Sequence, residues 1–378
     1  MKIRTITAGF NLELPLDRGR ICHIAEFVNS AKRAFEERGY PVQTVRVATQ
    51  PWEEYFTSKA QIVKLVRELE DLVNTYAVDY FNVGTTSNPR LIPIVYDLIK
   101  ETSKLFCTVL IADNTRIDHE AARQTAAIIK RLSTISPDGF SNLRFAALCN
   151  SGPGGAFFPA AYHSGPESFA IGTENSDLVF KAFSRARDME SAGRVLNKIL
   201  MEEFKKIEEI ANQISEEQRI SFEGIDVSIA TSVQPDESIA FSFEQLGLGR
   251  FGDVGTLAIA KIITDTIRDL EIRKCGYSGL MLPILEDYGL AMRNIDGTFN
   301  LTDLLLYSSV CGTGLDTIPL PGDTSEEKLY ALLLDIASIS IKLDKPLSAR
   351  LMPVPNRKAG EMTDYNFEYF ANTRIMNI

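Results

Sequence analysis

Residues 309–324 bring together side-chain types that often carry chemistry. A thiol, two glycines and a carboxylate fall within six residues, as Cys311, Gly312, Gly314 and Asp316. A cysteine thiolate can act as a nucleophile, although a packed and inert thiol is also common. The glycines allow close approach of the backbone to a ligand. This stretch predicts a turn facing a cleft, with Cys311 as a catalytic candidate and Asp316 as a substrate-binding candidate.

A second candidate is an aspartate inside an apolar strand. Residues 224–230 alternate so that Asp226 and Ser228 share one face, while isoleucine and valine side chains share the other. An apolar face packed on helices turns Asp226 and Ser228 inward, toward a ligand. A buried aspartate must be paired, hydrogen-bonded or bound to a metal. A functional role for Asp226 and a structural pair with Arg4 or Arg350 are both consistent with the pattern.

Glu286 and Asp287 form an adjacent pair of carboxylates after another apolar run. Such a pair can supply a general acid and base or bind a cation, whereas the alternative is a simple helix cap. Carboxylate oxygens suit magnesium, calcium or manganese. A divalent cation would therefore use Asp226, Glu286 or Asp316.

The loop at residues 150–155 is rich in glycine and contains Asn150. Its backbone N–H groups can cradle an anion, or the loop can simply connect two strands. His163 is the nearest histidine and is a candidate general base or ligand, with a structural histidine as the alternative. Asn11 follows the first strand. Because reactive groups in parallel α/β folds gather where strands end, Asn11 and Asn150 are substrate-binding candidates.

These residues sit on an alternation of short β-branched runs and amphipathic helices that continues from end to end. The pattern predicts about ten strands and about ten helices in a single domain spanning residues 1–378. A charged helical region is expected at about 176–215, exposed over 190–215 and serving as an interface or a solvated arm. So many βα units favour closure into a barrel. No G-x-G-x-x-G follows the first strand, so no nicotinamide cofactor is expected.

Composition limits the partners. The chain has 378 residues and a net charge of −10, which makes nucleic acid and anionic membranes poor partners. Five dispersed cysteines and three histidines argue against a disulfide framework and a zinc site. No long apolar run marks a signal peptide or a membrane span. A cytoplasmic protein is the expectation.

Five segments also resemble a known family. They are residues 4–9, 225–230, 276–289, 311–324 and 349–353, the last followed by Gly360. In this order they resemble the uncharacterised domain-of-unknown-function family number 711. The resemblance implies a ten-stranded α/β barrel similar to pyruvate formate-lyase and anaerobic ribonucleotide reductase.

Glycyl-radical enzymes with such a barrel store the radical on a C-terminal glycine in an Arg-Val-x-Gly-aromatic setting, and a cysteine attacks the substrate. Gly360 is the comparable glycine, but residues 357–361 lack the preceding Arg-Val and the following aromatic. We therefore expect the barrel without a glycyl radical, and a shared fold alone does not carry function.

The leading hypothesis is a non-radical enzyme that acts on a small polar or anionic metabolite, using carboxylates with or without a divalent cation. Arg4 and Arg350 would clamp a carboxylate or phosphate group. A non-catalytic metabolite-binding or sensory protein is the alternative, and a divergent glycyl-radical enzyme is a third hypothesis. The expected partner is a small molecule, and the sequence leaves homo-oligomerisation open.

Overall fold

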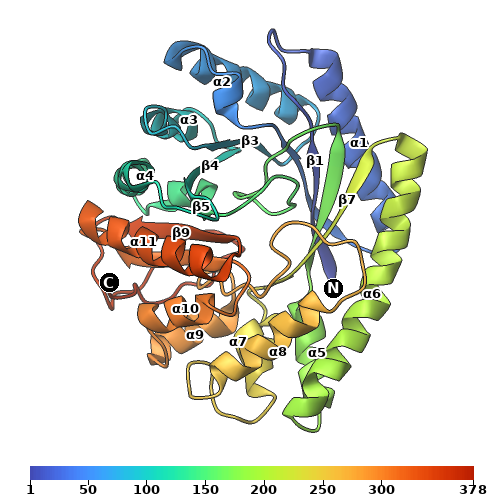
Figure 1. Cartoon of the computed structure of the whole chain (residues 1–378), viewed down its shortest axis with the longest axis vertical. Coiled ribbons are helices and arrows are strands. Elements are labelled where there is room, and N and C mark those ends of the chain that lie inside the picture. The colour runs from blue at the N-terminus through green and yellow to red at the C-terminus, as the bar shows by residue number, and fades with distance from the viewer.

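The computed structural model describes all residues, 1–378, as a mixed sheet with helices around it (Figure 1). The strands are β1 (Lys2–Gly9), β2 (Val42–Ala48), β3 (Tyr80–Thr86), β4 (Leu105–Ala112), β5 (Phe145–Cys149), β6 (Ser168–Glu174), β7 (Ser221–Ala230), β8 (Gly314–Pro321) and β9 (Leu347–Val354). The helices are α1 (Arg18–Glu36), α2 (Lys59–Thr75), α3 (Val95–Lys100), α4 (His119–Leu132), α5 (Ser176–Arg185), α6 (Met189–Gln218), α7 (Ile239–Glu244), α8 (Thr256–Arg268), α9 (Tyr288–Asp296), α10 (Leu301–Ser308) and α11 (Glu326–Leu343).

The strand order is β7-β6-β1-β2-β3-β4-β5-β9-β8. Strands β1 to β5 are parallel to one another. β6 and β9 pair antiparallel with β1 and β5, while β7 and β8 run parallel to β6 and β9. The five central strands thus run in one direction, and the pair of strands at each edge, β7-β6 and β9-β8, runs in the opposite direction. The beginnings of the central strands therefore lie at the same end of the sheet as the ends of the edge strands.

The expected tenth strand, at residues 277–282, is not a regular strand. Isolated parallel bridges instead join this part of the chain to both edge strands of the sheet: Ile225 to Lys274, Ile229 to Leu280, and Pro283 to Asp316. Gly276 and Ser278 have φ of +60° and +44°. A backbone in the left-handed region cannot continue a ladder of extended residues. Nine strands form, and the kinked segment links β7 to β8.

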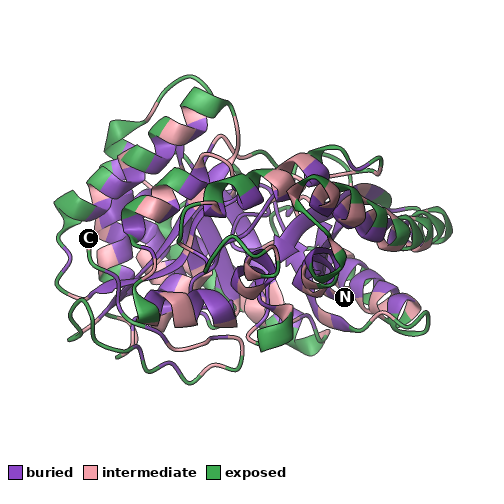
Figure 2. Ribbon diagram, turned by 90° about the horizontal axis from the view of Figure 1, so that it is seen from below, coloured by how far each residue is buried: buried purple, intermediate pink, exposed green.

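The charged region at 176–215 is two helices rather than one solvated arm. The Asp188 carboxylate accepts from the backbone N–H of Ser191 and starts α6 with a capping box. One face of α6 is buried, through Ala192, Leu196, Ile199, Leu200, Phe204, Ile207, Ala211 and Ile214. It packs on α5, α8 and β7, and Figure 2 shows the helices exposed on their outer sides only. Of the two possibilities left open for residues 190–215, an interface or a solvated arm, the arm does not form, because an apolar stripe runs beneath the charges.

The main core lies between the sheet and the helices. The apolar side chains of β7, namely Ile225, Val227 and Ile229, belong to it, as the alternation predicts. On the other side of the sheet, residues 150–167 run between β5 and β6 and pass close to several strands. Thr7 Oγ1 donates to the carbonyl of Ala156 at 2.7 Å, and the His163 N–H donates to Thr49 O at 2.9 Å. None of the helices is both long and apolar enough to cross a membrane.

Candidate functional site

A cavity of about 100 Å³ lies where β1 to β4 begin and β7 ends. Its charged lining residues are Arg4, Arg46, Arg350, Glu286 and Asp316. Its aromatic lining residues are Tyr80, Phe106, Phe157, Phe158, Phe367 and Tyr369. A site of this kind combines apolar walls with a few convergent charges, which is typical of small-molecule binding sites.

A chain of alternating charges runs along the edge of this cavity. Arg4 bonds to Glu174 at 2.6 Å and to Glu286 at 3.1 Å, and Arg350 bonds to Glu286 and to Asp316 at 2.6 Å each. All five side chains are between 8% and 15% exposed. Burial alone would lower the pKa of Arg350, but Asp316 and Glu286 outweigh it and raise that pKa. These five charged groups are therefore bonded to one another before any ligand binds.

Arg46 is the exception, because it lies at the cavity without a carboxylate partner. Only 9% of the residue is exposed. Its Nε donates to Thr44 Oγ1 at 3.0 Å, and its guanidinium lies over the rings of Tyr80 and Phe158, 5.6 and 5.2 Å from their centroids. Burial, followed by the charge of Arg4, lowers the pKa of Arg46 to about 10. The two Nη groups make no bond within the protein and remain available to an anion.

The charges of the cavity do not cancel. Three arginines and two carboxylates line it, which leaves one net positive charge in a largely apolar space. Coulomb interactions are strengthened where water is scarce. The cavity is thus matched to a monoanion, and a guanidinium can bind a carboxylate or phosphate through two parallel hydrogen bonds.

Asp287 does not reach this cavity. Its carboxylate is fully buried and accepts from Ser238 Oγ at 2.7 Å, from the N–H of Ile239 at 2.6 Å and from the N–H of Leu290 at 2.8 Å. It caps α9 and ties that helix to α7. Burial raises the pKa of Asp287 to about 6. The adjacent Glu286 points to the arginines instead, so the expected acid and base pair is split between two environments.

We predict that Asp287→Ala lowers the free energy of unfolding by about 2 to 4 kcal/mol, because it removes a helix cap and leaves several buried donors unpaired. Binding of an anion in the cavity should persist. Urea titration measures the first effect and calorimetry the second. A variant of normal stability that no longer binds anions would contradict this structural role for Asp287.

Asp226 is also held away from the arginines. Its Oδ1 accepts from Ser228 Oγ at 2.6 Å and from the Ser278 N–H at 3.0 Å, and its Oδ2 accepts from the Tyr277 N–H at 3.0 Å. The alternative of a structural pair with Arg4 or Arg350 is wrong, because the left-handed turn at Gly276 presents backbone N–H groups to the carboxylate. Asp226 and Ser228 thereby fix the kinked segment to β7. Burial nevertheless raises the pKa of Asp226.

The other predicted residues lie in separate places. His163 is buried, its Nε2 lies 2.9 Å from the carbonyl of Gly165, and burial lowers its pKa. Asn11 donates to the same carbonyl at 3.1 Å. Asn150 donates to Asp344 at 3.1 Å and lines a different cavity, together with Asp226. Cys311 is buried, and its sulfur accepts from the Gly314 N–H at 3.4 Å.

The structure does not gather the three candidate cation ligands. Glu286 and Asp316 both bond to Arg350, whereas Asp226 lines the cavity that contains Asn150. No group of three or more His, Cys, Asp or Glu side chains is placed to hold a metal ion. The arginines stand where a cation would have to bind.

Comparisons with known proteins place the chain in a family. The family model described as "Uncharacterised ACR (DUF711)" matches residues 1–366. The chain belongs to the DUF711 family. A UPF0210 protein of Clostridium botulinum (strain Alaska E43 / Type E3) is 26% identical, over 97% of this chain and 88% of that protein. One from Pyrobaculum aerophilum is 27% identical, over 96% and 87% of the two chains. A solved anaerobic ribonucleotide reductase has a TM-score of 0.46 and 12% identity to the DUF711 chain, covering 92% of this chain and 70% of that one.

The family match includes every charged residue of the cavity, since these lie between Arg4 and Arg350. Arg46 is a functional candidate that was not predicted from the sequence of this DUF711 protein. Thr44 and Arg46 alternate with Val45 and Val47 in β2, and this pattern is the only signal in the sequence. It usually indicates an ordinary polar face of a strand.

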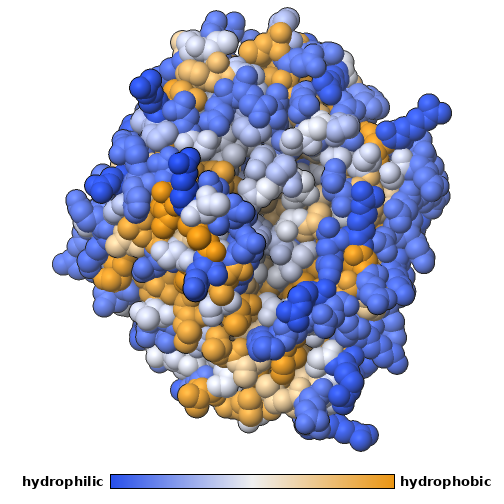
Figure 3. Space-filling model, viewed as in Figure 1, coloured by the Kyte–Doolittle hydropathy of each residue, from blue (hydrophilic) through white to orange (hydrophobic).

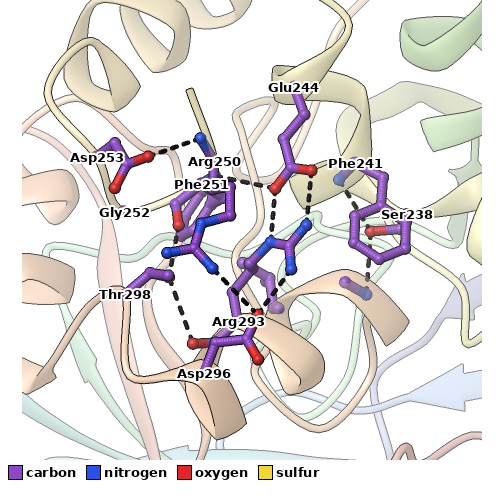
Figure 4. Close-up of polar contacts among 12 residues, drawn as sticks. Ser238, Phe241, Glu244, Arg250, Phe251, Gly252, Asp253, Arg293, Asp296 and Thr298 are labelled. Atoms are coloured by element: carbon purple, nitrogen blue, oxygen red, sulfur yellow. Dashed lines mark hydrogen bonds and ion pairs between the residues drawn. The ribbon is translucent and has the colours of Figure 1, made fainter. Parts of the chain in front are cut away.

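A second charged cluster of the DUF711 chain is purely structural and offers a comparison. Arg293 binds both oxygens of Glu244, at 2.7 and 2.8 Å, and also Asp296 at 2.8 Å. Glu244 in turn accepts from the N–H of Phe251 (Figure 4). These bonds hold the glycine-rich loop between α7 and α8, and none of these residues lines the cavity.

Proposed function

We propose that this protein binds a small monoanionic metabolite, with a carboxylate or phosphate group held by Arg46. The single observation that supports this is the guanidinium of Arg46, which is buried at a cavity without a carboxylate partner. Isolated charges are costly to bury, and a folded protein retains such a charge most readily where a ligand neutralises it.

The proposed site lies inside a closed barrel. The bridges from residues 274–283 to β7 and β8 support this closure, with the kinked segment taking the place of a tenth strand. The inner end of the cavity would then be sealed by residues of the 150–167 loop. Phe157 and Phe158 of this loop belong to the cavity wall. Exclusion of water by these rings would strengthen the attraction between Arg46 and the anion.

Binding is better supported than catalysis. Glu286 and Asp316, the two carboxylates that line the cavity, are each held by an arginine. They can accept hydrogen bonds from a ligand or orient the arginines. In this proposal Arg4 and Arg350 position the carboxylates, and Arg46 holds the anion. The sequence had suggested instead that Arg4 and Arg350 clamp the anion.

The test is isothermal titration calorimetry of the purified protein with acetate, propionate, butyrate and methyl phosphate. At least one anion should bind, and butyramide, which has nearly the shape of butyrate without its charge, should bind at least about 30-fold more weakly. Equal affinity for butyrate and butyramide, or no binding of any of the four anions, would refute the proposed function.

A further inference from the structure

A second, larger cavity of about 350 Å³ adjoins the first and shares lining residues with it. The residues common to both are Arg4, Gln43, Thr231, Glu286 and Tyr369. We call this second cavity the outer cavity and the cavity at Arg46 the inner cavity. The two cavities therefore adjoin at these five residues, and a ligand that occupies both would pass beside them.

The outer cavity has the opposite charge. Its charged lining residues are Lys2, Arg4, Glu174, Glu286 and Glu368, which leave one net negative charge. Lys2 bonds to Glu174 at 3.1 Å, and Arg4 bonds to both Glu174 and Glu286. Glu368 alone among these five groups forms no ion pair. It is exposed to solvent, unlike Arg46.

Each cavity thus contains one charged group that the protein leaves unpaired, and the two groups have opposite signs. Arg46 supplies the positive charge among aromatic rings, and Glu368 supplies the negative charge nearer to solvent. The inner cavity also has apolar lining residues, including Met281 and Pro283. This arrangement complements a ligand with an anion at one end, a short apolar body and a cation at the other.

We infer that the ligand is a zwitterion with separated charges, of the ω-amino carboxylate class. Its carboxylate lies on Arg46 in the inner cavity and its ammonium group lies in the outer cavity near Glu368. This inference rests on the proposed function, since it requires the anion to bind at Arg46. An α-amino acid fits poorly, because its ammonium group would lie beside its carboxylate, among the arginines.

The segment that carries Glu368 is suited to this role. Hydrogen bonds join the two ends of this segment. The Thr363 hydroxyl donates to Asn372 Oδ1 at 2.8 Å, and the Thr373 N–H donates to Thr363 Oγ1 at 3.0 Å. Its Tyr369 ring lies over the Arg4 guanidinium, 5.4 Å from carbon to centroid. Glu368 is therefore held at the mouth of the outer cavity by its neighbours.

Calorimetry with matched ligands tests the inference. 4-Aminobutyrate or 5-aminopentanoate should bind about five-fold more tightly than butyrate or pentanoate respectively, as expected for one partly exposed ion pair. 2-Aminobutyrate should bind more weakly than butyrate. In Glu368→Gln the five-fold gain should disappear, while butyrate binds as in the unaltered protein. Glu368 is exposed, so this variant should fold normally.

The outcomes separate the two proposals. If butyrate binds but neither ω-amino acid binds more tightly than its parent carboxylate, the zwitterion inference is wrong and the proposed function stands. Persistence of the gain in Glu368→Gln also overturns the inference. If methyl phosphate binds but no carboxylate does, the inference alone fails. If none of the four anions binds, the proposed function fails, and the inference fails with it.

Discussion

Arg350→Met should lower the free energy of unfolding by about 3 to 5 kcal/mol, which is the usual cost of removing one partner from a buried ion pair. The substitution removes the only ion-pair partner of Asp316 and one of the two partners of Glu286. Methionine fills most of the vacated volume, so the loss reports the unpaired carboxylates rather than an empty space. Urea titration at pH 7 measures this effect.

A second substitution gives an internal check on the Arg350→Met defect. Glu286→Gln combined with Arg350→Met should recover part of the stability, because it replaces a carboxylate that has lost one partner with a neutral amide. No recovery in the double variant would show that packing, not charge, is responsible.

Arg46→Met should have the opposite effect on stability and a large effect on binding. The pKa of Arg46 is lowered to about 10 by burial, from an ordinary value of 12.5. That difference corresponds to a cost of about 3 kcal/mol for burying the charged guanidinium. The contacts of the guanidinium with the rings of Tyr80 and Phe158 offset up to about 2 kcal/mol of this cost. The variant should therefore be about 1 to 2 kcal/mol more stable than the unaltered protein, and its affinity for the anion should fall about 100-fold.

The sign of the Arg46 effect follows from linkage. A basic group whose pKa is lower in the folded chain holds its proton less tightly there than in the unfolded chain. Its protonated form therefore favours unfolding. The cost of burying Arg46 is therefore fully present at pH 7 and declines only as the pH rises through about 10. Stability is gained and function is lost in the same substitution, as expected of a group retained for a ligand.

Arg293→Met is the matched control for both arginine substitutions. It removes a half-buried arginine that bonds to Glu244 and Asp296, away from the cavity. It should destabilise the fold and leave anion affinity unchanged. Loss of anion binding in Arg293→Met would mean that general loosening of the structure, not the loss of Arg46, explains the binding defect.

The net charge of the chain and the charge of the inner cavity have opposite signs. Figure 3 shows polar residues over much of the visible face, with apolar patches toward its lower part. The net charge of −10 is spread over this surface, while the inner cavity is positive. An anion is thus repelled at long range and attracted at short range, so added salt should speed its entry.

Of the residues predicted at strand ends, Glu286 lies at the inner cavity, whereas Asn11 and Asn150 do not. Arg4, Asp316 and Arg350 lie within β1, β8 and β9, and the fold brings them into ion pairs with or beside Glu286. Their mutual pairing was not readable. It depends on which strand neighbours which, and the order of the sheet cannot be deduced from a local pattern.

The missed and misplaced residues have a common physical cause. The burial of Arg46 comes from Tyr80 and Phe158, which are distant in sequence. Asp226 is satisfied by backbone N–H groups of a left-handed turn rather than by an arginine. Side-chain types suggest chemistry, but the partners that decide between function and structure are supplied by the fold.

The most direct measurement is a crystal structure of the protein with butyrate, or with whichever tested anion binds best, at a concentration that saturates calorimetric binding. The anionic group should lie in the inner cavity, with its oxygen atoms about 2.7 to 2.9 Å from the Nη atoms of Arg46. The pairs of Arg350 with Glu286 and Asp316 should remain intact. An anion bound outside the inner cavity, or Arg46 turned away from it, would contradict the proposed function.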